Sequence, residues 1–138
     1  GKGGIGKSMV SSHITYALSA KGLRILHVGC DLKHDSTRLL LKGRMPETVL
    51  ETLRHKDFKV DSISMDEVIF ESSFNNECEG QIYCAESGGP DPGVGCGGKG
   101  VVEAIETLKR LDAFKKLELD VVLYDVLGDV VCGGFAMP

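Results

Sequence analysis

The sequence has no block of basic residues, no long apolar run and no pair of cysteines at C-x-x-C spacing. Its net charge is −4 at pH 7, so neither nucleic acid nor an anionic membrane is expected as a main partner. No apolar stretch reaches the length needed to span a bilayer, and none resembles a secretory signal. The five cysteines therefore predict a reducing compartment and a cytoplasmic location.

Five cysteines are present and scattered: Cys30, Cys78, Cys84, Cys96 and Cys132. They do not pair with the four histidines at a zinc-binding spacing. Cys84 lies in an apolar segment and is expected to be a small buried hydrophobe. A hydrophobic content of 42% and a charged content of 26% are ordinary for a single globular domain over residues 1–138. We expect this domain to be incomplete at both ends, with its first strand and its C-terminal part outside the sequence.

The strongest motif opens the chain and fits the phosphate-loop pattern G-x-x-x-x-G-K-[ST]. Glycines let successive backbone N–H groups turn toward phosphate oxygens, where a Cβ would clash. The pattern's lysine brings positive charge to the terminal phosphates, and its serine hydroxyl is a Mg²⁺ ligand. The simpler alternative is a glycine-rich turn before a helix. The predicted nucleotide-binding residues are Gly1, Lys2, Gly3, Gly4, Ile5, Gly6, Lys7 and Ser8, with Ser8 also on Mg²⁺.

Lys2 is extra to the phosphate-loop pattern, which needs only one lysine. Its presence indicates a charge aimed at a nucleotide from another direction, across a subunit boundary.

Hydrophobic periodicity predicts that strands and helices alternate. The predicted helices are 8–22, 48–54, 64–70 and one that follows residue 100; the predicted strands are 23–29, 81–86 and 119–124. The last strand is a nearly continuous apolar run, as expected of a buried parallel strand. A phosphate loop inside a strand–helix–strand unit predicts the α/β fold of a P-loop NTPase, with a mostly parallel sheet flanked by helices.

Acidic residues follow two of the predicted strands. Asp31 and Asp35 come after the strand 23–29, at the sheet edge where open α/β folds bind ligands. Asp31 is predicted to position Mg²⁺ or the attacking water, whereas Asp35 is explained equally well as a helix cap. Asp125 ends the strand 119–124, the position where P-loop NTPases keep an acid linked to Mg²⁺.

Two cysteines, Cys96 and Cys132, share a setting of glycine neighbours, a strand end before and a helix start after. Glycines permit close approach of the backbone to an iron–sulfur cluster and N–H bonds to its sulfurs. One chain would supply two thiolates, whereas a [4Fe–4S] cluster takes four, so a symmetric dimer would complete the site. The spacing alone leaves a second interpretation open, in which both are ordinary loop cysteines.

The longer motifs of the sequence are Gly1–Ser8, Gly29-Cys-Asp31, Lys33, Asp35–Thr37, Glu86–Pro90, Pro92–Cys96 and Tyr124–Pro138. They resemble the nitrogenase iron protein (dinitrogenase reductase) family, and the resemblance runs from end to end, most loosely over residues 42–80. It implies an ATP-driven, homodimeric one-electron donor, an oxidoreductase whose single [4Fe–4S] cluster bridges the subunits. Its electrons would come from ferredoxin or flavodoxin and go to a molybdenum–iron component for nitrogen fixation.

The resemblance also implies roles for individual residues. Cys96 and Cys132 would be the cluster ligands, and Lys2 would reach across the dimer. Residues 31–37 would form a first nucleotide-responsive switch that includes Asp35. The segment from Asp125 to Cys132 would form a second switch, in which Asp125 and Asp129 sense the γ-phosphate and Mg²⁺. The implied catalytic residues are Lys2, Asp31, Asp125 and Asp129, with MgATP and the cluster as cofactors.

Some positions depart from the family's usual residues: Met9, Leu32, His34 and Lys99. His34 resembles the nitrogenase-like reductases of tetrapyrrole synthesis, which keeps a protochlorophyllide reductase-like partner as an alternative. Lys99 stands where many members have an arginine that is reversibly ADP-ribosylated, and lysine lacks the guanidinium that is modified. An alternative of a different class is a ParA/MinD-like ATPase without redox chemistry, which would explain Lys2 but not the two cysteines.

Overall fold

A computed structural model describes residues 6–29, 35–75, 79–88 and 97–125 of the chain. Its elements, in order, are α1 (Lys7–Ala20), β1 (Arg24–Gly29), α2 (Asp35–Arg38), α3 (Val49–His55), the 3₁₀ turns η1 (Val60–Ser62) and η2 (Met65–Glu67), β2 (Phe70–Glu71), β3 (Gln81–Glu86), α4 (Gly97–Arg110), α5 (Ala113–Lys116) and β4 (Val121–Asp125). The predicted alternation of helices and strands is confirmed. No helix in these described ranges is both long enough and apolar enough to cross a membrane.

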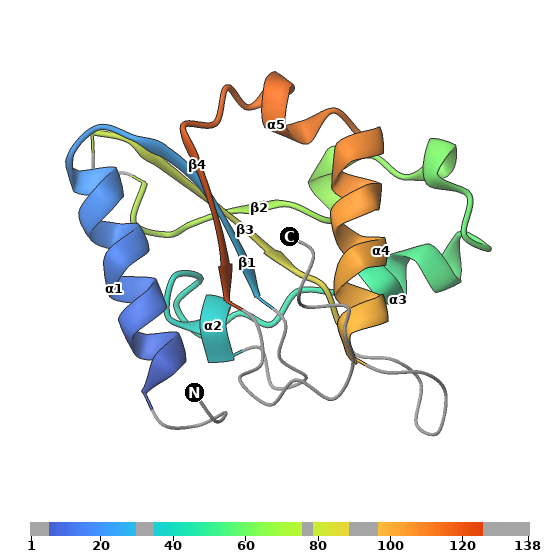
Figure 1. Cartoon of the computed structure of the whole chain (residues 1–138), viewed down its shortest axis with the longest axis horizontal. Helices are drawn as coiled ribbons and strands as arrows, with labels where there is room; N and C mark the ends of the chain where they lie inside the picture. The colour runs from blue at the N-terminus through green and yellow to red at the C-terminus, as the bar shows by residue number, and fades with distance from the viewer. Residues whose placement is uncertain (1–5, 30–34, 76–78, 89–96, 126–138) are drawn as a thin grey trace.

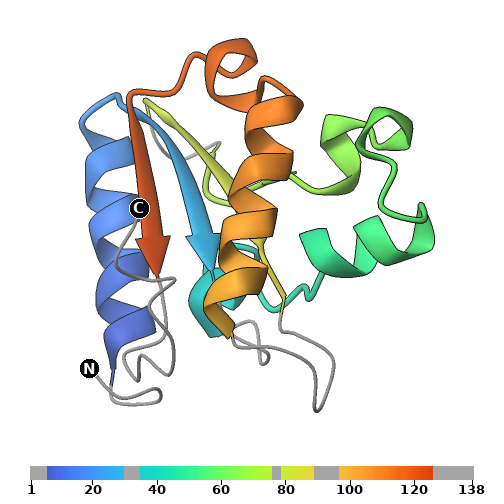
Figure 2. The ribbon, with the colours of Figure 1, turned by 45° about the vertical axis from the view of Figure 1, so that its right-hand side comes forward.

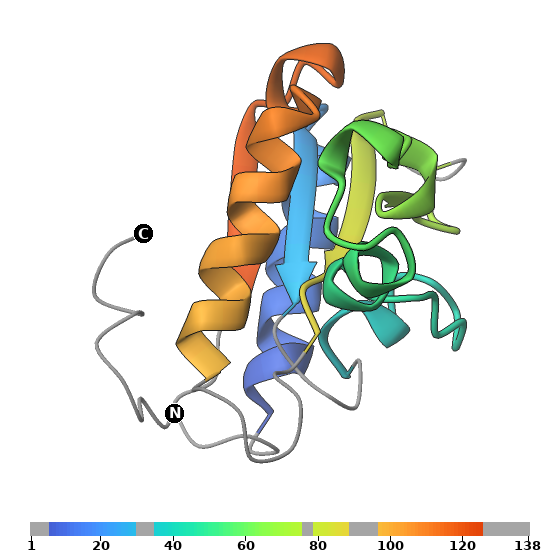
Figure 3. The same ribbon diagram turned by 90° about the vertical axis from the view of Figure 1, so that its right-hand side faces the viewer.

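The four described strands form one sheet in the order β2-β3-β1-β4. Strand β1 pairs in parallel with β3 on one side and β4 on the other, and the short β2 adds an antiparallel edge to β3. Helix α4 lies in front of the sheet and α1 lies behind it (Figure 3). The predicted α/β class with a mostly parallel sheet flanked by helices is therefore confirmed.

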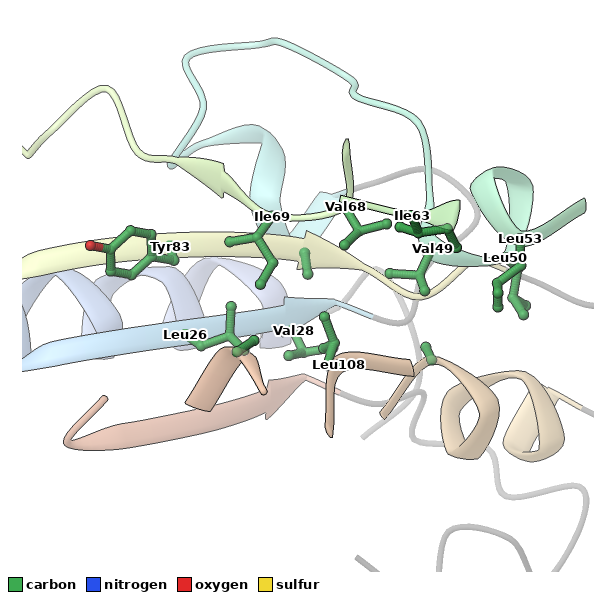
Figure 4. Close-up of a cluster of buried hydrophobic side chains, with 13 residues drawn as sticks. Leu26, Val28, Val49, Leu50, Leu53, Ile63, Val68, Ile69, Tyr83 and Leu108 are labelled. Carbon is green, nitrogen blue, oxygen red and sulfur yellow. The ribbon is translucent and has the colours of Figure 1, made fainter. Parts of the chain in front are cut away.

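The larger hydrophobic cluster lies between the sheet and the layer that contains α3 and α4 (Figure 4). Leu26 and Val28 of β1 face Leu108 of α4, and all three are almost fully buried. Burying side chains of this size contributes about 1.5–3 kcal/mol each. Residues Leu40 and Leu41, after α2, form a smaller cluster on the other face with two residues of β3.

Helix α3 begins where the sequence predicts it. Thr48 is its N-cap: its hydroxyl accepts from the backbone N–H of Glu51 at 3.1 Å, and the Glu51 carboxylate accepts from the N–H of Thr48 at 3.0 Å. The expected helix over 64–70 is shorter than predicted. Its capping box at Ser64 is present, but the turn ends at Glu67 because Phe70 pairs with β3 in the sheet.

The side of α1 that faces the sheet is polar, which its apolar periodicity did not indicate. Ser12, Thr15 and Ser19 are buried, whereas Val10 and Ile14 are 59% and 46% exposed. One of these residues has a polar partner in the sheet: the Thr15 hydroxyl lies 2.7 Å from Nδ1 of His27, a fully buried residue of β1. This hydrogen bond to a buried imidazole accounts for the buried hydroxyl of Thr15.

Strand β4 was predicted to be buried and is only half-buried before Asp125. It is parallel to β1, as expected, but it lies at the edge of the described sheet, with a strand neighbour on one side. The apolar run Val121–Tyr124 therefore predicts the strand correctly but overstates its burial.

Cys84 is fully buried in β3, as predicted for a structural cysteine. Burial raises the pKa of its thiol well above the usual range, the Glu86 carboxylate raises it further, and Arg44 opposes the shift. Because the thiolate is the reactive form, native Cys84 should react with iodoacetamide at least about a hundredfold more slowly than an exposed thiol. Mass spectrometry of alkylated peptides would measure this, with denatured protein as the control. Equal labelling in both states would contradict the burial.

Candidate nucleotide-binding site

Helix α1 begins at an edge of the sheet that suits an anion. Gly6 is its N-cap with φ 74° and ψ 0°, a left-handed conformation that glycine adopts at little cost, and Gly6 has no side chain of its own to cap the helix. The first N–H groups of a helix have no partners within it, and the helix dipole adds positive potential there. The start of α1 lies at the end of the sheet where β1 and β4 finish (Figures 1 and 2).

Three strand ends meet at this edge. Gly29, the last residue of β1, is in register with Glu86 of β3 on one side and Asp125 of β4 on the other. Residues in register point to the same face of a sheet, so the two acids flank Gly29 on one face. Both are buried, with Glu86 1% and Asp125 4% exposed. The prediction that Asp125 ends a parallel strand is confirmed, and the structure adds that this strand lies beside β1; the contact of Asp125 with Mg²⁺ stays a prediction.

Glu86 was not singled out by the sequence as a functional residue. Its carboxylate leans over Gly29, where a Cβ would lie 2.6 Å from its carboxyl carbon, and its Oε1 accepts a 2.6 Å hydrogen bond from the Thr37 hydroxyl. Thr37 belongs to α2 and is fully buried. The signal that could have identified Glu86 is an acidic residue at the end of a predicted strand, next to a glycine-rich segment.

Few of the predicted site residues fall within the described part of the chain. Lys7 and Ser8 begin α1, and Asp35 is the first residue of α2, whereas its alternative explanation made it the cap before a helix. The others lie outside the described residues: Gly1, Lys2, Gly3, Gly4, Ile5, Asp31, Cys96, Asp129 and Cys132. Within the described residues, no three histidine, cysteine or acidic side chains gather closely enough to hold a metal ion.

Gly29→Ala in the full-length protein should lower the free energy of unfolding by about 3 kcal/mol, because the added methyl overlaps the Glu86 carboxylate. In a Glu86→Ala background the same substitution should cost at least about 1 kcal/mol less. Denaturant titration measures both values. Gly43→Ala is the control, since nothing lies within 4 Å of its added Cβ and only its φ of +89° is unfavourable. An equal cost of Gly29→Ala in both backgrounds would contradict the overlap.

A parallel sheet with a glycine-capped helix start and a buried acid at one carboxyl edge defines an α/β domain of the nucleotide-binding class. Residues 1–138 match the model of the family described as "4Fe-4S iron sulfur cluster binding proteins, NifH/frxC family". The chain belongs to this family, and the resemblance found in the sequence is confirmed.

Individual relatives agree with the family match. The chain is similar to nitrogenase iron protein 2 of Paenibacillus durus, with 51% identity over 138 residues, which cover 100% of this chain and 44% of the relative. It is 50% identical over 138 residues to the nitrogenase iron protein of Methanococcus voltae, covering 100% of this chain and 46% of that protein. The chain therefore spans somewhat less than half the length of these relatives.

Proposed function

We propose that the full-length protein is an ATP-dependent one-electron donor. It would couple ATP hydrolysis to electron transfer from a [4Fe–4S] cluster to a molybdenum–iron component in nitrogen fixation. The observation that carries the proposal is the family match over all 138 residues, together with relatives near 50% identity that are named nitrogenase iron protein. The carboxyl edge described above supports the nucleotide half of this function.

MgATP fits the residues present at that edge. The start of α1 behind Gly6 suits phosphate oxygens, and Asp125 lies on the strand next to the end of β1. Lys7 would neutralise the terminal phosphates, and Ser8 with Asp125 would hold or orient Mg²⁺ and its water. Lys2 would reach the nucleotide of the partner subunit, while Asp31, Asp35 and Asp129 would respond to the γ-phosphate.

The proposal of a cluster depends on the chemistry of two cysteine thiolates and not on a geometry among the described residues. Cys96 directly precedes α4, whose first residue is Gly97, and a thiolate before a helix start is stabilised by the helix dipole. Cys132 comes seven residues after Asp125 in the sequence. Two chains would supply the four thiolates of one shared [4Fe–4S] cluster, which provides the one-electron chemistry when bound.

This arrangement would let the bound nucleotide change the reduction potential of the cluster. Asp125 lies at the carboxyl edge of the sheet, where the nucleotide would bind, and the proposed cluster ligand Cys132 follows it seven residues later in the sequence. A shift of 0.1 V in a one-electron potential corresponds to only about 2.3 kcal/mol. That is a modest demand on the binding energy of a triphosphate.

The partners in the proposal are a second copy of the protein, a molybdenum–iron component, and ferredoxin or flavodoxin as the electron source. His34 is the one observation that favours a tetrapyrrole-reducing component instead, and the names of the relatives weigh against it.

Acetylene reduction tests the proposal. Full-length protein purified without oxygen and reduced with dithionite should support ethylene formation by a molybdenum–iron component, and omission of MgATP should abolish it. Protein that fails here but drives a tetrapyrrole-reducing component would establish the alternative partner. Protein that hydrolyses ATP but never contains iron would instead match a ParA/MinD-like ATPase.

A further inference from the structure

The hydrogen bond between Thr37 and Glu86 joins two parts of the chain that the proposed function uses separately. Thr37 lies in α2 and is the last residue of the predicted first switch, residues 31–37. Glu86 ends β3, and the predicted cluster ligand Cys96 comes ten residues further along the chain. The two residues are 49 positions apart in the sequence, and their side chains meet at 2.6 Å in a buried environment.

The Thr37–Glu86 hydrogen bond is shielded from solvent, because neither side chain has access to water. Thr37 is 0% and Glu86 1% exposed, so neither can exchange this hydrogen bond for one to solvent. A hydrogen bond to a carboxylate is among the stronger kinds, and it strengthens further in surroundings of low polarity. A displacement of α2 therefore either moves the Glu86 carboxylate with it or deprives a buried charge of one donor.

The backbone after Glu86 is itself held to neighbouring elements. The N–H of Ser87 donates to the carbonyl of Gly29 at 2.9 Å, and the carbonyl of Ser87 accepts from the N–H of Leu50 in α3 at 3.1 Å. Gly88 follows with φ +86°, beside the Thr48 hydroxyl. A movement of Glu86 is thus passed on to Ser87 and Gly88 rather than absorbed by a loose segment.

We propose that the Thr37–Glu86 hydrogen bond is a positioning contact that transmits nucleotide state from α2 to the end of β3 and so toward Cys96. It is separate from the route through Asp125 and Cys132, and it gives the other cluster ligand its own link to the nucleotide. The inference rests on the proposed function, because it assumes that MgATP displaces the predicted first switch, residues 31–37.

Thr37→Val in the full-length dimer tests this link, because valine keeps the shape of threonine and removes the hydroxyl. Hydrogen–deuterium exchange would be measured with and without MgATP for peptides covering 31–38 and 87–100. In the wild type both peptides should change their exchange on nucleotide binding. In Thr37→Val the change in 31–38 should remain, whereas the change in 87–100 should fall at least about threefold. A second measurement is the MgATP-dependent rate at which an iron chelator removes the cluster, which should fall in parallel.

Two variants serve as controls. Thr37→Ser keeps the hydroxyl and should restore the wild-type response. Thr52→Val makes the same substitution at a buried threonine of α3, whose hydroxyl bonds the carbonyl of Thr48 at 3.0 Å, and it should leave the response unchanged. If Thr37→Val does not fold, Glu86→Asp replaces it, since the shorter side chain keeps the charge but draws back from Thr37.

Each outcome decides the matter. An unchanged response of 87–100 in Thr37→Val overturns the inference while leaving the proposed function standing. An equal loss in Thr52→Val also overturns it, because the effect would then reflect general destabilisation. A wild-type protein that binds no MgATP or holds no cluster overturns the proposed function and this inference together.

Discussion

Replacing Cys96 by alanine should leave the full-length protein without its [4Fe–4S] cluster. The wild-type dimer is expected to contain about four iron atoms in one shared cluster, with two thiolates from each subunit. Loss of one residue removes two of the four ligands, because the substitution occurs in both subunits of a symmetric dimer. Iron analysis and the visible absorption of protein purified without oxygen would measure the loss, and Cys132→Ala should behave in the same way.

Cys84→Ala is the matched control for the cluster experiment. Cys84 is buried in β3 among apolar side chains, and it is expected to contribute packing but no metal ligand. Its replacement should cost about 1 kcal/mol of stability and leave the iron content unchanged. Normal iron content in Cys96→Ala or Cys132→Ala would disprove the ligand assignment, and with it the dimer-bridging cluster.

Asp125→Asn should lower MgATP hydrolysis by about a hundredfold or more, measured as phosphate release with the electron-accepting component present. Asparagine has nearly the same shape as aspartate and lacks the charge that would act on Mg²⁺. Removing one well-placed electrostatic group from a reaction centre typically costs a factor of 10²–10³ in rate. The position of Asp125 supports an effect of this size, because its side chain is 4% exposed and lies at the carboxyl edge of the sheet, where the nucleotide would bind.

Asp120→Asn provides the control for this substitution. Asp120 immediately precedes β4 and lies at the opposite end of the strand, where its carboxylate accepts a 2.9 Å hydrogen bond from the N–H of Arg24 in an exposed setting. Hydrolysis should be unchanged in this variant. Rates that remain near wild type in Asp125→Asn would remove Asp125 from the catalytic residues.

The strands β1, β3 and β4 and the helix after the phosphate loop could be predicted closely from local pattern, whereas the short β2 was not predicted. Residues 81–86 form β3 as predicted, and the expected capping box at Ser64 and Glu67 is present. These features depend on interactions between residues close in sequence, which is why local spacing reports them. The burial of β4 and the inward face of α1 could not be predicted, because they depend on which element lies beside them.

The sequence by itself determined the class of this protein: the motif at Gly1–Ser8, the acid at Asp125 and the glycine-flanked Cys96 and Cys132 led to the correct family. The phosphate loop could be recognised because it needs particular residue types at short spacings, and the two cysteines because each lies among glycines in a motif that resembles the family. Only the tertiary structure decided that Glu86 and Asp125 flank Gly29 and that Glu86 accepts a hydrogen bond from Thr37. Those relations depend on strand order and register, which bring together residues far apart in the chain and leave no local pattern.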